Sequence, residues 1–166
     1  MLGFIMAMRV YFSFDYDRDF WKVLEIKSCW VINSDRESAG IIDSSAWEFL
    51  TLQGNYEVMK WIRNQLLGTS VTVVLIGAET YVKEYVNYQI LLSRERKNGL
   101  LGVYIHNIED SNGKKDLKGE NPFDNFRDTN SGLLFSQIYP TYDWVEDDGY
   151  DNFAHWVETA AALSGK

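Results

Sequence analysis

One stretch, residues 70–99 (SVTVVLIGAETYVKEYVNYQILLSRERKNG), places the strongest limit on how this chain can fold. Residues 70–76 form a run of Val, Thr, Leu and Ile that alternates too little to leave one face in water. Such a run predicts a central strand buried on both faces. Gly77 interrupts the run, Glu79 or Thr80 offers a helix N-cap, and about sixteen residues of helical pattern follow.

The end of the stretch completes a recognisable unit. Lys97, Asn98 and Gly99 close the predicted helix with a cation in the last turn and a residue that tolerates the left-handed conformation. Strand, sharp turn and helix make half of a βαβ unit. In sheets built from such units, ligands bind beyond the carboxyl ends of the strands, so we expect a site at that edge.

Periodicity and turn residues predict the rest of the chain. The expected elements are strands over residues 9–14, 39–42, 100–105 and 133–139, and helices over 18–31, 54–67 and 152–163. Residues 106–132 are polar and form a predicted loop long enough to indicate function or an insertion. This order predicts an α/β fold of flavodoxin-like type, a mostly parallel sheet with helices on both faces.

Length, net charge and cysteine content limit the expected domain organisation, partners and cellular compartment. With 166 residues we expect a single domain over residues 8–166, preceded by an N-terminal extension of residues 1–7. That extension is apolar but short, so we expect neither a signal peptide nor a membrane span. A net charge of −8 argues against a nucleic-acid partner. The single cysteine, Cys29, fits a reducing cytoplasm, and its apolar helical surroundings favour a packed thiol over a nucleophile.

Several functional classes lack their motifs here. Neither a Walker A loop nor a GxGxxG sequence follows any predicted strand. A response-regulator receiver needs a phosphoacceptor Asp at the end of the third strand, where this chain has Ile76, Gly77 and Ala78. A flavodoxin needs a Ser/Thr/Gly-rich loop after the first strand, where this chain has FDY. Two His and one Cys give no metal constellation, so no metal is expected.

Six segments in collinear order carry a resemblance. RVYFSFDYDRD resembles the first-strand signature of TIR domains, in which an aromatic-Ser-aromatic run ends the strand beside a nucleotide pocket. The segments SAGIIDSSAWE, GTSVTVVLIGAETY, VNYQI, NGLLGVYIHNIED and YDWVEDDGY resemble the TIR-like proteins of the bacterial Thoeris anti-phage system, the ThsB group. The resemblance extends over residues 8–156.

The resemblance implies an activity. Thoeris TIR proteins use NAD+ as a substrate rather than a cofactor. They break the nicotinamide–ribose bond and release a diffusible signal derived from ADP-ribose, often cyclic, which activates an effector protein. Neighbouring subunits commonly take part, so a homo-oligomer is among the expected partners. The family carries a catalytic glutamate in a Tyr-Glu-Ile context on the helix after the third strand, and the matching tripeptide here is Tyr88-Gln89-Ile90.

Gln89 therefore stands at the family's catalytic position without its charge. Cleaving an N-glycosidic bond builds positive charge on the ribose, which a carboxylate stabilises. Glutamine keeps the shape and one acceptor oxygen but has no charge and no basicity. Losing such a group typically lowers the rate by about two to three orders of magnitude, whereas binding that depends on shape and hydrogen bonding is less affected.

Alternatives for this position stay open. Gln89 is either an engineered Glu→Gln change, a natural variant that is silent or uses another acid, or an ordinary polar residue at a helix edge. Otherwise Glu79, Glu84 or Glu95 takes the catalytic role. Glu84 precedes Gln89 by five positions, about 140° around a helix, so we expect it to face elsewhere. Glu79 at the helix start suits a cap or dipole partner.

The resemblance also points to residues that bind the substrate, at the ends of the first, second and fourth strands and beside Gln89. They are Phe12, Ser13, Phe14, Asp43, Ser45, Trp47, Tyr88 and His106. Each has a structural alternative: strand-end aromatics are commonly core, Trp47 can be a packed indole, and His106 a hydrogen-bonded structural residue. A catalytically silent module that binds nucleotide or assembles with other TIR domains is the alternative for the whole chain.

Overall fold

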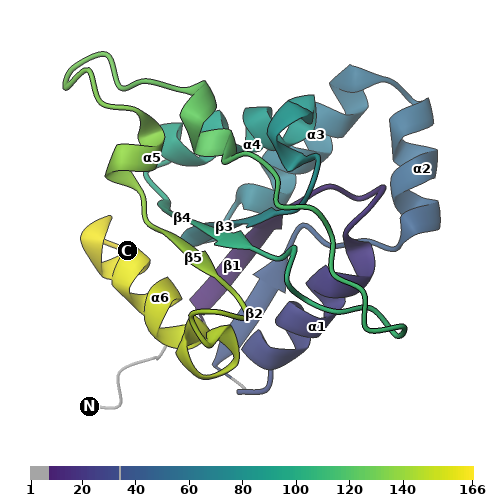
Figure 1. Ribbon diagram of the computed structural model, residues 1–166. Coiled ribbons are helices and arrows are strands. Elements are labelled where there is room, and N and C mark those ends of the chain that lie inside the picture. The colour runs from purple at the N-terminus through teal and green to yellow at the C-terminus, as the bar shows by residue number, and fades with distance from the viewer. Residues whose placement is uncertain (1–7, 34) are drawn as a thin grey trace, which may run out of the picture.

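The fold is an open parallel sheet between two layers of helices (Figure 1). The computed structural model describes residues 8–33 and 35–166, and the extension predicted at residues 1–7 lies outside them. All pairings are parallel, in the order β2-β1-β3-β4-β5. The strands are β1 (Met8–Ser13), β2 (Arg36–Ala39), β3 (Val71–Ile76), β4 (Gly99–Tyr104) and β5 (Thr141–Asp143). This confirms the predicted α/β, flavodoxin-like class.

The helices divide between the two faces of the sheet (Figure 1). Helices α1 and α6 cover one face, while α3 and α4 cover the other. Their bounds are α1 (Phe20–Trp30), α2 (Ser44–Leu52), α3 (Asn55–Leu66), α4 (Glu84–Glu95), α5 (Phe135–Ile138) and α6 (Gly149–Leu163), with short 3-10 helices η1 (Thr80–Val82) and η2 (Pro122–Asn125).

The central strand β3 has the environment that its sequence predicts. Val71, Val73 and Leu75 belong to the core under α1 and α6. Val74 and Ile76 point to the opposite face and pack in the core under α4. All five are fully buried, and burial of such a side chain contributes about 1.5–3 kcal/mol. Because β3 has no solvent-exposed face, helices must cover both faces of the sheet.

The turn after β3 differs in detail from the prediction. Thr80 and Glu79 do not cap α4, because η1 comes first and Lys83 is the N-cap residue of α4. The hydroxyl of Thr80 instead accepts a hydrogen bond from the Gly77 amide at 2.8 Å. At the other end of α4, Lys97 rather than Gly99 adopts the left-handed conformation, with φ of 62°.

The second strand ends earlier than predicted. It covers Arg36–Ala39 rather than 39–42, and Gly40, with φ of 82°, turns the chain away from the sheet. The phenol of Tyr16 fixes this turn, since it donates to the Gly40 carbonyl at 2.6 Å and accepts from the Ile42 amide at 3.1 Å. The chain then enters α2 at Ser44, a helix that was not among the predicted elements.

The predicted strand over residues 133–139 is wrong. Its apolar run forms the short helix α5, and the fifth strand follows it as the three-residue β5. Phe135 is the buried residue of α5, and it packs next to η2 in the core between α4 and the sheet. Residues 106–132 are mostly irregular, as expected, with η2 as their helical part.

Two smaller features complete the description. Cys29 on α1 is half-buried, and burial, aided by Glu25, raises the pKa of its thiol, so it remains protonated at neutral pH. Across residues 8–33 and 35–166, none of the helices combines the length and apolar character needed to span a bilayer.

Candidate active site

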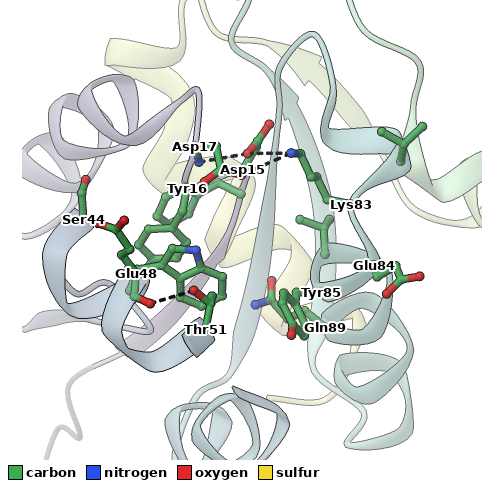
Figure 2. Close-up of a pocket in the computed structure, with 14 residues that line it drawn as sticks. Asp15, Tyr16, Asp17, Ser44, Glu48, Thr51, Lys83, Glu84, Tyr85 and Gln89 are labelled. Carbon is green, nitrogen blue, oxygen red and sulfur yellow. Dashed lines mark hydrogen bonds and ion pairs between the residues drawn. The ribbon is translucent and has the colours of Figure 1, made fainter. Parts of the chain in front are cut away.

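A pocket of about 690 Å³ opens beyond the carboxyl end of β1, between α2 and the start of α4 (Figure 2). Its size lies within the range usual for small-molecule sites. The residues that line it come from the β1–α1 turn, α2 and the η1–α4 segment. They are Phe14, Asp15, Tyr16, Asp17, Ser44, Trp47, Glu48, Thr51, Val82, Lys83, Glu84, Tyr85, Val86 and Gln89.

Gln89 projects from α4 toward the end of β1. Its side chain is 3% exposed, and its Oε1 accepts a hydrogen bond from the hydroxyl of Ser13, the last residue of β1. This contact joins the helix to the strand end and fixes the orientation of the carboxamide. A carboxylate at the same position would accept the same hydrogen bond, because only the acceptor oxygen is used.

An ion pair closes one side of the pocket (Figure 2). The ammonium of Lys83 lies 3.6 Å from Oδ1 of Asp15 and 3.4 Å from Oδ2 of Asp17. Burial raises the pKa of the Asp15 carboxyl even though Lys83 acts in the opposite direction. Partial burial disfavours the charge on Lys83, but Asp15 and Asp17 together raise the pKa of its ammonium. For Asp15, burial thus opposes the charged form of the carboxyl and the Lys83 ammonium favours it.

Three aromatic residues form another wall of the pocket. Trp47 of α2 stacks on Tyr16 with ring centroids 4.3 Å apart and planes 8° from parallel. Tyr85 meets the same indole edge-on at 5.8 Å. Because Tyr16 also fixes the turn after β2, the stack links the position of α2 to the end of β1. Half-buried Trp47 offers a flat apolar surface for a heterocycle.

The structure brings together four of the residues predicted from the sequence. Phe14, Trp47 and Gln89 line the pocket, and Ser13 reaches it through its bond to Gln89. These residues come from the end of β1, from α2 and from α4, which are far apart in the sequence. The parallel strand order brings them together at one edge of the sheet. Their role in binding or catalysis stays a prediction.

Three other predicted residues lie outside the pocket lining. Phe12 is buried in the core, where it packs against Phe153 of α6 at 6.1 Å. Asp43 is the N-cap of α2, and its carboxylate accepts from the Ala46 amide at 2.7 Å. Ser45 is exposed on the first turn of α2, and its neighbour Ser44 lines the pocket in its place.

Tyr88 and His106 are also placed elsewhere. The Tyr88 hydroxyl accepts from the Arg63 guanidinium at 3.1 Å on the contact between α3 and α4. His106 follows β4, two strands from β1, and its Nε2 lies 3.9 Å from Oδ2 of Asp143. Neither side chain lines the pocket.

Among the alternative acids, Glu84 was expected to face away from Gln89, and Figure 2 shows its carboxylate pointing away from Gln89. Glu84 is the first residue of α4, and the pocket wraps around that end of the helix, so both residues line it. Glu79 is exposed and lies 3.6 Å from the Arg18 guanidinium. Glu95 is exposed at the far end of α4.

The sequence reasoning missed several residues of the site. Asp15, Tyr16 and Asp17 follow the strand predicted over residues 9–14 but were not among the predicted site residues, although side chains directly after a parallel strand lie at the ligand edge. That position was the available signal. Lys83 gave no comparable signal, because its place depends on the 3-10 turn that precedes α4.

A parallel sheet in this strand order, with a pocket between the end of β1 and the helix after β3, defines a flavodoxin-like α/β domain with a ligand site at the carboxyl edge of its strands. Residues 11–110 match the family model described as "Thoeris protein ThsB, TIR-like domain", and the chain belongs to this family. It is 31% identical over 191 aligned positions to a Bacillus cereus (strain MSX-D12) protein named "Putative cyclic ADP-D-ribose synthase ThsB1". The match covers 92% of this chain and 100% of that relative.

Proposed function

We propose that this chain binds NAD+ in the pocket at the end of β1, and that the pocket is built to cleave the nicotinamide–ribose bond. The product would be an ADP-ribose-derived signal, cyclic in the relative's named activity, that activates a Thoeris effector in anti-phage defence. The observation that carries the proposal is the position of Gln89, held by Ser13 in the wall of an acidic pocket.

The charge of the pocket suits this reaction. When the C1′–N bond breaks, its electron pair leaves with nicotinamide and the ribose becomes an oxocarbenium-like cation. The described residues that line the pocket include four acids (Asp15, Asp17, Glu48 and Glu84) and one cation, Lys83, which contacts Asp15 and Asp17. Even with a neutral Gln89, the surroundings favour a cation over an anion.

Gln89 makes this chain a slow form of the enzyme. Its carboxamide can accept a hydrogen bond from a ribose hydroxyl but cannot supply charge or accept a proton. We therefore expect Gln89→Glu to raise nicotinamide release by about 10²–10³-fold. The variant should fold, because the Ser13 hydroxyl can donate to a carboxylate as it does to Oε1.

The test is to incubate NAD+ with the unaltered protein and with Gln89→Glu, and to analyse the products by mass spectrometry. Gln53→Glu is the matched control, since Gln53 is exposed at the end of α2 and makes the same change of charge outside the pocket. Release of nicotinamide by Gln89→Glu alone supports the proposal. If neither the unaltered protein nor Gln89→Glu releases nicotinamide, including in cells infected by phage, the proposal is overturned.

A second candidate is a catalytically silent module that binds nucleotide or assembles with other TIR domains. Two observations favour it: the neutral Gln89, and an α2 helix that buries none of its residues and leaves Phe49 and Leu52 68% and 81% exposed. This candidate predicts NAD+ binding by calorimetry without turnover. It also predicts no gain of turnover from Gln89→Glu, which separates it from the first.

A further inference from the structure

Lys83 holds an unusual position in the pocket. It is the N-cap residue of α4, its side chain is 32% exposed, and it faces the two carboxylates of Asp15 and Asp17 (Figure 2). Its separations from them, 3.6 and 3.4 Å, exceed the 2.7–2.9 Å of a tight charge-assisted hydrogen bond. The ammonium is thus shared between two acids at distances longer than a tight hydrogen bond and is not fixed to either of them.

Asp15 is the more constrained of these acids. Its side chain is 1% exposed, whereas that of Asp17 is 75% exposed. Oδ1 accepts from the Asp17 amide at 3.0 Å, but Oδ2 has no hydrogen-bond partner among residues 8–33 and 35–166. A buried carboxylate oxygen without a partner is unfavourable, so a positive charge near Asp15 is favoured.

The two ends of a bound dinucleotide would interact with different groups, one with the Lys83 ammonium and the other with the carboxylates. NAD+ carries a doubly negative diphosphate and a cationic nicotinamide riboside. Four carboxylates of the pocket repel the diphosphate, and the Lys83 ammonium is the cation among its described lining residues. A phosphate oxygen competes well for a lysine that is partly exposed and carried on a flexible stem.

We propose that, when the substrate binds, the Lys83 ammonium exchanges its counter-ion: it moves from the carboxylates of Asp15 and Asp17 to the diphosphate. Lys83 then no longer neutralises Asp15, and the Asp15 carboxylate becomes the negative charge that faces the nicotinamide riboside. In a chain with Gln89, Asp15 supplies the charge that the glutamine lacks. This inference rests on the proposed function, since it assumes that NAD+ occupies the pocket.

The role of Lys83 is tested by calorimetry with Lys83→Met. Lys83 makes no capping hydrogen bond to α4 but is the cation beside the buried Asp15, so circular dichroism checks that the variant folds. We expect NAD+ to bind about tenfold more weakly, with reduced salt dependence, and nicotinamide riboside, which has no phosphate, to bind no more weakly than before. Lys60→Met, an exposed lysine of α3, is the control. Equal losses for both ligands, or no loss for either, would refute the exchange.

The role of Asp15 is tested by comparing NAD+ with NADH, which has the same phosphates but a neutral dihydronicotinamide. We expect the preference of the unaltered protein for NAD+ to fall about tenfold in Asp15→Asn. The isosteric change removes a buried charge and keeps Lys83, and circular dichroism checks the fold. The control is Asp35→Asn, at an exposed aspartate outside the pocket. An unchanged preference in Asp15→Asn would show that Asp15 does not face the ring.

The outcomes separate the two proposals. If the unaltered protein binds no NAD+, the proposed function fails and the counter-ion exchange falls with it. If NAD+ binds and the Lys83 and Asp15 variants behave like their controls, only the counter-ion exchange is refuted.

Discussion

Asp19 is a buried acid whose removal should stabilise the protein at neutral pH. It precedes α1, is fully buried, and neither carboxylate oxygen has a hydrogen-bond partner among the described residues. Burial raises its pKa to about 6. Asp15 and Asp116 raise the pKa further, while Lys22 and Arg18 lower it.

The sign and size of the effect follow from proton linkage. With a pKa of 3.8 in the unfolded chain and about 6 in the fold, Asp19 binds its proton more tightly when folded. This contribution to stability is fully present below about pH 4 and is lost as the pH rises through 6. The difference corresponds to about 3 kcal/mol at pH 7.5.

Asp19→Asn removes the charge and nearly keeps the shape. We expect the variant to be more stable than the unaltered protein by about 1–3 kcal/mol at pH 7.5, less than the full value because the amide also lacks partners. At pH 4.5 the ionisation cost that the variant avoids should fall to about a third of its value at pH 7.5, because Asp19 in the fold is then mostly protonated. Urea unfolding at both pH values measures this, with the exposed Asp35→Asn as control. A gain that is the same at both pH values, or a loss at pH 7.5, would refute the reasoning.

Two further predictions concern packing and binding. Gly119→Ala should lower the free energy of unfolding by about 1–3 kcal/mol, because a Cβ there would overlap the Gly77 carbonyl oxygen. Urea unfolding measures the loss, with Ser111→Ala at an exposed position of the same loop as the control. Equal stabilities of the two variants would contradict the close packing at Gly119. Trp47→Ala should weaken NAD+ binding by about 1–3 kcal/mol through loss of a stacking surface; calorimetry measures it, and unchanged affinity would place the heterocycles elsewhere.

The fold could be predicted best where burial leaves a periodic signal. β3 and α4 were recognised because a strand buried on both faces and a helix packed on the sheet have distinct patterns. Helix α2 was missed because it buries no residue, so its apolar side chains follow no core-facing period. The run at residues 133–139 was misassigned because a short apolar segment does not distinguish strand from helix.

The site was predicted only in part for a related reason. Gln89 and Trp47 could be located from the resemblance and from the ends of strands. The ion pair of Lys83 with Asp15 could not, because it joins a turn after β1 to a helix start after β3. Phe12 directly precedes Ser13, and alternate side chains of β1 point to opposite faces. Its ring therefore lies in the core under α1 and α6 and does not line the pocket.

The structure of the unaltered protein determined with saturating NAD+ tests the central claim most directly. We predict a dinucleotide in the pocket between α2 and α4, with a ring on Trp47, the ribose against Gln89, and a phosphate oxygen within hydrogen-bonding distance of the Lys83 ammonium. A pocket that stays empty at saturating NAD+, or a nucleotide bound at another surface, would contradict it.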